Sequence, residues 1–284
     1  MTTGTIEPTP GARKARRPIT LRTLAEMTSR GDPFACLTCY DATTARWLER
    51  AGVHLLLVGD TAAEVILGLP ATIHMPLEIA IALTAAVKRG APNTVVMADM
   101  PFMSYQADDA EAVRNAGRFL TDGMADVVKL EADKSFAPLL SKMARAGVPL
   151  CGHVGSKPQR SGLTGGYTSA GRTKAQAQAV IDDAMALEDA GCVMLLVEAV
   201  PAEVADQILE RTTVPMIGIG AGPACHGQIL VLQDLLGLTD HQPPFADTVA
   251  NFGASLQEAA GQWVRRVSAR EASAHRYHMR RESV

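Results

Sequence analysis

Residues 51–60 read Ala-Gly-Val-His-Leu-Leu-Leu-Val-Gly-Asp, and the plan of this stretch recurs along the chain. First comes a glycine, which can take the left-handed conformation that ends a helix. An apolar run follows, and a polar residue lies at the end of the run. Residues 146–153 (Ala-Gly-Val-Pro-Leu-Cys-Gly-His) and 190–198 (Ala-Gly-Cys-Val-Met-Leu-Leu-Val-Glu) repeat this order. Continuous apolar runs are typical of strands in a parallel sheet covered on both faces. The stretch therefore predicts an α/β fold.

Outward from this stretch, eight runs are expected to form strands: Ala35–Cys39, Leu55–Val58, Val95–Ala98, Val127–Leu130, Pro149–Gly152, Val193–Val197, Pro215–Gly218 and Ile229–Leu232. Helical patterns lie between them, at Ala42–Ala51, Leu77–Arg89, Asp109–Asp122, Phe136–Ala146, Lys174–Ala190 and Ala202–Arg211. Eight such units are the number in a (β/α)8 TIM barrel. The alternative is a doubly wound open sheet, which most readily carries a glycine loop after its first strand, where this chain reads Tyr40-Asp41-Ala42-Thr43. We therefore predict a TIM barrel with an extra N-terminal helix at about Leu21–Arg30.

The domain organisation follows from the lack of any long linker or composition break. We expect a single barrel catalytic domain over residues 19–270, because such a barrel takes about 250 residues. Residues 1–18 are expected to form a flexible basic tail and residues 271–284 a polar tail. The N-terminal tail lacks the apolar region of a signal peptide, and a transit peptide is the alternative to a solvated tail.

Composition excludes several classes of protein. Lys and Arg number 27 against 30 Asp and Glu, a net charge of −3, and aromatic residues make up 4%. Nucleic-acid binding is therefore not expected, since it needs a basic face or stacking side chains. No apolar stretch approaches the roughly 20 residues of a membrane span. The five cysteines, an odd number lying mostly in apolar runs, predict reduced buried thiols in a cytoplasmic protein.

Cys36 and Cys39 form a C-x-x-C pattern, for which a redox or zinc site is the alternative interpretation. Their place in an expected strand opposes it, because side chains three positions apart on a strand point to opposite faces. No second C-x-x-C completes a zinc site.

Chargeable residues gather where the expected strands end. Asp60 and Asp99 end the second and third units, Lys129 and Glu131 lie at the end of the fourth, His153 follows the fifth and Glu198 the sixth. Each alone is explained by a helix cap, a turn or an ion pair. Together they meet at the end of the barrel where catalysis occurs. Converging carboxylates need a neutralising cation, and oxygen ligands suit Mg²⁺ or Mn²⁺.

Two of these positions indicate roles. Lys129 and Glu131 are two residues apart and so share one face of a strand. The lysine is suited to hold a substrate carboxylate or phosphate. Glu198 ends an otherwise apolar strand, a setting that suits a general base.

From about Thr38 to Gly237 the sequence resembles the ketopantoate hydroxymethyltransferase family. The matching motifs are Thr38-Cys39-Tyr40-Asp41, Leu57-Val58-Gly59-Asp60, Arg89-Gly90-Ala91-Pro92, the run from Ala98 to Tyr105, Val128-Lys129-Leu130-Glu131, Cys151-Gly152-His153-Val154-Gly155 with Pro158-Gln159, Gly165-Gly166-Tyr167, Gly171-Arg172, Val197-Glu198, the run from Ile217 to Gly222, and Gly227-Gln228-Ile229-Leu230-Val231. The resemblance implies a (β/α)8 barrel enzyme of pantothenate biosynthesis. Such an enzyme transfers a hydroxymethyl group from 5,10-methylenetetrahydrofolate to C3 of 3-methyl-2-oxobutanoate, giving 2-dehydropantoate through a Mg-stabilised enolate.

The resemblance also implies roles for individual residues. Asp60 and Asp99 would ligate one Mg²⁺ per subunit, or Mn²⁺, with Glu131 completing the site directly or through water. Asp60, Thr61, Asp99 and Lys129 would contact the keto acid. Glu198 would be the proton acceptor. The family forms homo-oligomers, often decamers, so a cytoplasmic oligomer acting on small molecules is expected.

Four departures from the family pattern bear on the folate pocket and on substrate preference. They are Glu64 after Asp60-Thr61-Ala62-Ala63, Ala82-Leu83 in place of Tyr-His, Ser156-Lys157 in place of Leu-Thr before Pro158-Gln159, and His226 before Gly227-Gln228. Two alternatives stay open. One is a Mg-dependent C–C lyase of the phosphoenolpyruvate and isocitrate lyase type, whose usual Lys-x-x-Cys-Gly motif is absent here. The other is a non-catalytic keto-acid-binding paralogue.

Overall fold

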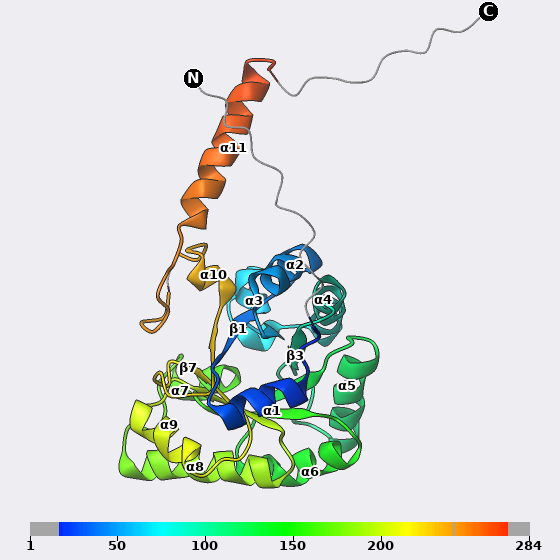
Figure 1. Ribbon diagram of the computed structural model, residues 1–284, viewed down its shortest axis with the longest axis vertical. Helices are drawn as coiled ribbons and strands as arrows, with labels where there is room; N and C mark the ends of the chain where they lie inside the picture. The colour runs from blue at the N-terminus through cyan, green and yellow to red at the C-terminus, as the bar shows by residue number, and fades with distance from the viewer. Residues whose placement is uncertain (1–16, 241, 272–284) are drawn as a thin grey trace, which may run out of the picture. The chain divides into compact units, whose positions relative to one another are not determined.

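The computed structural model describes residues 17–240 and 242–271 and contains a closed barrel of eight parallel strands in chain order (Figure 1). The strands are β1 (Phe34–Thr38), β2 (Leu55–Val58), β3 (Val95–Asp99), β4 (Val127–Glu131), β5 (Leu150–Gly155), β6 (Met194–Glu198), β7 (Met216–Ile219) and β8 (Gly227–Leu230). The predicted (β/α)8 TIM barrel is confirmed. The strand β5 runs on to Gly155, so His153 lies within it instead of after it.

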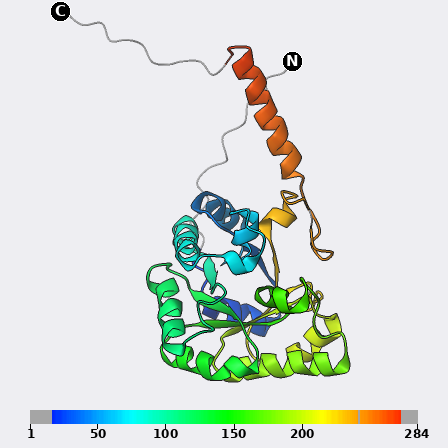
Figure 2. The same cartoon turned by 180° about the vertical axis from the view of Figure 1, so that it is seen from behind.

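The helices are α1 (Leu21–Arg30), α2 (Ala42–Ala51), α3 (Ala62–Val65), α4 (Leu77–Gly90), α5 (Asp109–Thr121), α6 (Ala137–Arg145), α7 (Ser161–Thr164), α8 (Lys174–Asp189), α9 (Ala202–Leu209), α10 (Leu232–Leu235) and α11 (Phe252–Ser268). The helices α4, α5, α6, α8 and α9 form a layer outside the strands, as the front and back views show (Figures 1 and 2). Both α1 and α2 have the predicted bounds. The helical patterns with bounds predicted from the sequence end at Arg211, before α10 and α11.

Local chemistry sets the ends of these helices. Asp41 accepts hydrogen bonds from the main-chain N–H groups of Thr43 and Thr44 at the start of α2. Gly52 ends the same helix at φ 97°, a left-handed conformation that glycine takes without steric cost. The opening stretch of the sequence thus forms a capped helix that turns directly into β2.

Alternate strand residues point into the barrel, where they form a core separate from the one under the helices. Phe34, Cys36, Leu55 and Met97 belong to this inner core, and Leu24 of α1 packs with them. The extra N-terminal helix therefore covers part of the barrel interior. Cys39 belongs instead to the outer core. The two cysteines of the C-x-x-C pattern point to opposite faces of the sheet, and all five cysteines are free and buried.

The chain separates into two compact units, which end and begin at Val231 and Leu232. The first unit holds all eight strands, and the second holds α10 and α11. None of the residues of α11 is buried. The single domain over residues 19–270 stays a prediction, and both predicted tails lie almost wholly outside the described residues. No helix in the described part of the chain has the length and apolar character needed to cross a membrane.

Candidate active site

The inward face of neighbouring strands becomes polar at the carboxyl ends of the strands. The register pairs Asp99 of β3 with Lys129 of β4 and pairs Glu131 with His153 of β5. Glu198, the last residue of β6, is opposite Gly155. Asp60 follows β2 by two residues and is buried. Period-two alternation thus places the strand-borne charged residues in one layer above the apolar interior.

Lys129 and Asp99 form a buried ion pair in this layer. The Lys129 Nζ lies 2.7 Å from Asp99 Oδ2. Burial opposes the charge of Lys129, but Asp99, Asp60 and Glu131 outweigh it and raise the pKa of the ammonium group. Burial also raises the pKa of Asp99 to about 7, against the opposing effect of Lys129. The site therefore holds a permanent cation beside a carboxyl group that titrates near neutral pH.

Asp60 and Glu131 are joined to the same pair through hydrogen bonds. The main-chain N–H of Asp60 donates to Asp99 Oδ2 at 3.3 Å, and the side-chain amide of Gln159 donates to Asp60 Oδ2 at 2.9 Å. The main-chain N–H of Gln159 donates to both carboxylate oxygens of Glu131, at 3.3 and 3.1 Å. Burial raises the pKa of Glu131 well above its ordinary value, with Lys129 opposing the rise. Three strand ends thus contribute carboxylates to one connected network.

His153 lies between Lys129 and Glu198. Its Nδ1 is 3.3 Å from Lys129 Nζ, and its Nε2 is 3.3 Å from Glu198 Oε2. Burial and the neighbouring Lys129 lower the pKa of the imidazole, which favours its neutral form. Only 1% of the His153 side chain is exposed, against 22% for Glu198. Glu198 is therefore the carboxylate of this layer that solvent or a small molecule reaches most easily.

The backbone after Glu198 turns sharply. Ala199 has φ 48°, a left-handed conformation that is uncommon for a residue with a side chain. Hydrogen bonds from Ala199 N–H to the carbonyl of Ile219 and from Ala170 N–H to the carbonyl of Ala199 hold this turn. A backbone conformation of this kind persists only where surrounding contacts hold it in place, and such conformations are common at functional sites. The turn fixes where β6 ends and so where Glu198 stands.

Thr61 is the predicted site residue with the weakest connection to this network. It follows Asp60 and precedes α3, where its side chain makes no capping hydrogen bond. It is half-buried.

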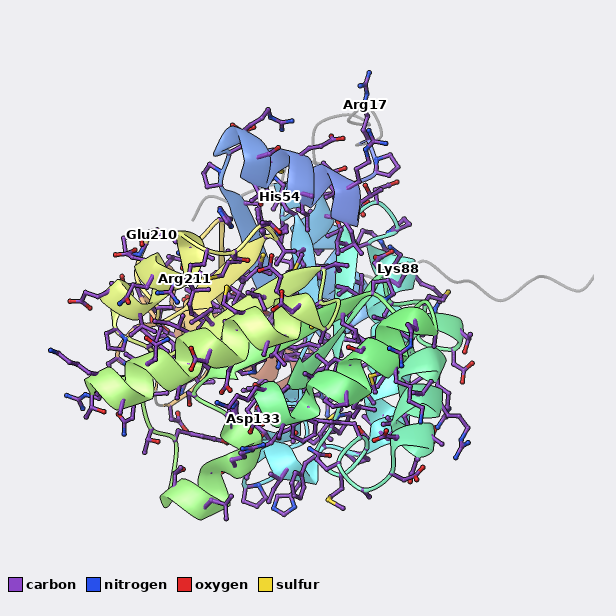
Figure 3. All side chains as sticks on the ribbon, turned by 90° about the horizontal axis from the view of Figure 1, so that it is seen from below. Arg17, His54, Lys88, Asp133, Glu210 and Arg211 are labelled. Carbon is purple, nitrogen blue, oxygen red and sulfur yellow. The ribbon has the colours of Figure 1, made fainter. Side chains whose placement is uncertain are left out.

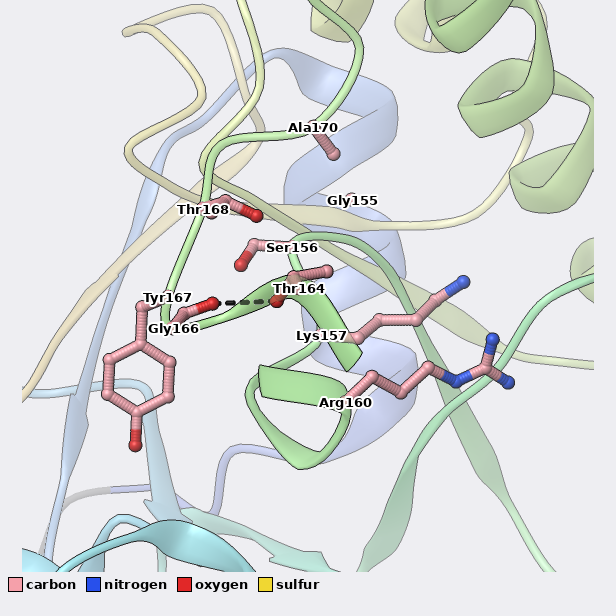
Figure 4. Close-up of a pocket in the computed structure, with 9 residues that line it drawn as sticks. All are labelled: Gly155, Ser156, Lys157, Arg160, Thr164, Gly166, Tyr167, Thr168 and Ala170. Atoms are coloured by element: carbon pink, nitrogen blue, oxygen red, sulfur yellow. Dashed lines mark hydrogen bonds between the residues drawn. The ribbon is translucent and has the colours of Figure 1, made fainter. Parts of the chain in front are cut away.

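A pocket of about 160 Å³ lies beside the loop that follows β5 (Figure 4). Ser156, Thr168 and Tyr167 are among its lining residues. The Tyr167 hydroxyl is 3.0 Å from Glu64 Oε2. The glycine-rich stretch 161–171 thus contacts the segment after β2 through Glu64, one of the residues that depart from the family pattern. Two cations of the lining are held by carboxylates: Lys157 by Asp183 at 3.6 Å and Arg160 by Asp133, labelled in Figure 3, at 2.9 Å.

The donor set matches the chemistry of a hard divalent cation. Asp60, Asp99 and Glu131 offer only carboxylate oxygens, which Mg²⁺ and Mn²⁺ prefer. Asp99 Oδ1 is buried and has no hydrogen-bond partner, the state of an acceptor that a cation can satisfy. Within residues 17–240 and 242–271, no three His, Cys, Asp or Glu side chains converge as a ready-made metal cluster. The residue types thus suit a divalent metal ion, while Lys129 and Gln159 already contact one carboxylate oxygen each of Asp99 and Asp60.

Sequence reasoning assigned no role to two members of this network. It placed His153 at a strand end, directly after a run expected to stop at Gly152. It assigned nothing to Gln159, which lies in the turn Pro158–Arg160 after β5. Period-two counting from Cys151 would have placed His153 on the inward face. No pattern in the sequence brings Gln159 to Asp60.

Charged side chains gathered at the carboxyl ends of barrel strands are the arrangement by which (β/α)8 barrels carry out catalysis. The chain is an enzyme of that class. The family model for ketopantoate hydroxymethyltransferase matches residues 18–273. The chain belongs to this family and is a transferase.

Relatives of known name agree over most of the chain. The 3-methyl-2-oxobutanoate hydroxymethyltransferase of Pyrobaculum aerophilum is 46% identical over 235 residues, which are 83% of this chain and 89% of that protein. The protein of the same name from Thermobifida fusca is 42% identical over 255 residues, covering 90% and 91% of the two chains.

Solved structures with little sequence similarity share the fold. Phosphonopyruvate hydrolase, solved in complex with oxalate and Mg²⁺, has a TM-score of 0.57 at 13% identity, covering 88% of this chain and 86% of its own. A 2,3-dimethylmalate lyase has a TM-score of 0.58 at 18% identity, covering 86% and 87%. Such likeness shows the barrel architecture alone.

Proposed function

We propose that the protein transfers a hydroxymethyl group from 5,10-methylenetetrahydrofolate to C3 of 3-methyl-2-oxobutanoate, giving 2-dehydropantoate for pantothenate biosynthesis. The relatives that are at least 40% identical over the aligned residues are named for the hydroxymethyltransferase reaction on this keto acid. The observation that carries the proposal is the contact of His153 with Glu198 at 3.3 Å, next to the buried Lys129. This contact places Glu198, a partly exposed base, beside the cluster formed by Asp60, Asp99, Lys129 and Glu131. That cluster is suited to bind a 2-oxo acid.

Each residue has a defined task in this proposal. Lys129 keeps its charge and neutralises the substrate carboxylate, while Asp60, Thr61 and Asp99 orient the keto acid. Asp60 and Asp99, with Glu131 directly or through water, would hold one Mg²⁺ or Mn²⁺. Bound there, the ion would supply Lewis-acid stabilisation of negative charge on the keto oxygen.

Glu198 takes the proton from C3, and neutral His153 keeps the carboxylate of Glu198 in place. The electron pair left on C3 forms the new bond to the methylene carbon of the folate, and water adds to the same carbon to give the hydroxyl group. The two C–N bonds from this carbon to N5 and N10 break, and tetrahydrofolate leaves with the proton taken by Glu198 and the proton released by water on these two nitrogens. We further infer a homo-oligomer, which sedimentation analysis of the whole chain can test.

The test follows the C3 proton. The protein is incubated with Mg²⁺ and 3-methyl-2-oxobutanoate in D₂O, and loss of the C3 signal is recorded by NMR before methylenetetrahydrofolate is added. We expect exchange first and 2-dehydropantoate after the folate. Glu198→Gln should still bind the keto acid but lose exchange, whereas Glu210→Gln, a surface change on the residue after α9, should exchange like the parent.

Exchange at the full rate in Glu198→Gln would remove Glu198 as the base. Exchange without product would contradict the folate part of the proposal. Binding with neither exchange nor product would favour a keto-acid-binding protein.

A further inference from the structure

Gln159 is a buried amide whose every hydrogen-bonding group is used. It is 5% exposed, and its Nε2 donates to Asp60 Oδ2 at 2.9 Å and to the carbonyl of Met100 at 3.0 Å. Its Oε1 accepts from Gln106 Nε2 at 3.2 Å and lies 2.9 Å from the Tyr105 hydroxyl, whose one proton it shares with the carbonyl of Glu131, also at 2.9 Å. Two donors face acceptors and two acceptor positions face donors, so the orientation of the amide is set by its partners.

The same residue contacts a second carboxylate through its main chain. Its N–H lies 3.3 and 3.1 Å from the two carboxylate oxygens of Glu131. Gln159 is thus bonded to Asp60 after β2, to Met100 after β3 and to Glu131 of β4. A residue from the loop after β5 therefore connects the ends of the three strands that carry the carboxylates.

We propose that Gln159 is a positioning residue for divalent-cation binding, which holds the carboxylates of Asp60 and Glu131 in the orientation that presents their remaining oxygens to the ion. This inference rests on the proposed function, since it assumes a cation at these carboxylates. An amide suits the task because it fixes one oxygen of Asp60 while adding no charge to the site. Outer partners of this kind typically change metal affinity by about 10–100-fold.

The experiment measures Mn²⁺ binding to the full chain by electron paramagnetic resonance, without substrate, after removal of bound metal. Gln159→Met keeps a side chain of similar length and the main-chain N–H to Glu131, but loses the donor to Asp60. We expect the dissociation constant for Mn²⁺ to rise by about 10–100-fold.

Asn115→Leu is the matched control. Asn115 is also a buried amide, and it donates to the carbonyl of Ser104 at 2.8 Å. Its loss should lower the unfolding temperature as a buried unpaired carbonyl does, with Mn²⁺ affinity unchanged. A purely structural role for Gln159 would make the two variants behave alike, and that result overturns the inference.

Tyr105→Phe decides the matter if Gln159→Met does not fold. It removes a donor to Gln159 Oε1 and so loosens the amide that donates to Asp60. We expect Mn²⁺ binding to weaken severalfold, and unchanged affinity would overturn the inference. A parent protein that binds no Mn²⁺ would contradict the metal in the proposed function as well as this inference. Equal binding by parent and variants would contradict this inference alone.

Discussion

The ammonium group of Lys129 lies 2.7 Å from Oδ2 of Asp99, with 5% and 2% of the two side chains exposed. Two charges in so dry a place are tolerable only together, because each loses its hydration. Asp60 and Glu131 bring two further carboxyl groups to the same network. Lys129 is therefore the group that allows three carboxyl groups to share the site in the metal-free protein.

Lys129→Met should destabilise the metal-free protein by about 3–5 kcal/mol, the usual cost of leaving a buried charge without its partner. Urea denaturation in the presence of EDTA measures this free energy of unfolding. Lys142→Met is the control, because Lys142 is 47% exposed and 3.7 Å from Asp109, and such surface pairs contribute at most about 1 kcal/mol. Equal losses of unfolding free energy in the two variants would show that the buried ion pair stabilises the protein no more than the surface pair does.

Binding of Mg²⁺ should strengthen as the pH rises through neutrality. Burial raises the pKa of Asp99 to about 7, so below that pH the carboxyl group is mostly protonated and the ion must displace its proton. Glu131, whose pKa burial also raises, adds to the effect. Calorimetry in two buffers of different ionisation enthalpy should show proton release at about pH 6 and less at about pH 8. An affinity independent of pH across this range would argue against Asp99 as a ligand.

Gly155→Ala should damage both stability and activity. At φ 96° an added side chain is strained, and its Cβ would overlap the carbonyl oxygen of Glu198. Strain alone costs about 1–3 kcal/mol, and a shift of Glu198 of about 1 Å can slow catalysis on the order of 10²-fold.

Thermal unfolding and the C3 exchange rate measure the two effects. Gly162→Ala serves as the comparison, because its Cβ would meet nothing within 4 Å. Gly162→Ala should leave the unfolding temperature and the C3 exchange rate near those of the parent. A Gly155→Ala variant that also matched the parent in both would contradict this prediction.

The native protein should resist thiol reagents. All five cysteines are buried, and burial raises the pKa of Cys39 and Cys225 to about 11 and that of Cys192 to about 12, so little thiolate forms. Ellman's reagent should detect five thiols only after denaturation. Leu163→Cys, at a residue 86% exposed, gives the positive control for rapid reaction. Fast modification of the folded parent would contradict the burial of these side chains.

The sequence predicts the barrel well because the signals for it are local. The glycine that ends α2 and the apolar run of β2 fix both elements within about ten residues of chain, and β2 has the predicted bounds. The positions of Asp99, Lys129 and Glu131 follow from period-two alternation and strand register in the same way.

The connections of Gln159 could not be predicted, because they depend on how the loop after β5 folds back over the strand ends. The link from Tyr167 to Glu64 has the same origin, since the two residues lie 103 positions apart. The sequence also gives no sign that α11 stands in a separate unit, because its apolar residues resemble those of a helix that packs on a barrel.

The hydrogen bond from Gln159 to Asp60 joins residues 99 positions apart. Because a contact of this length closes a large loop of chain, we expect it to form late in folding, after the intervening strands have paired. The carboxylates of the site therefore come together only when β2 to β5 are already in register. A metal ion in solution would meet these carboxylates close together on the native protein and only scattered on folding intermediates, so we expect it to slow unfolding more than it speeds folding.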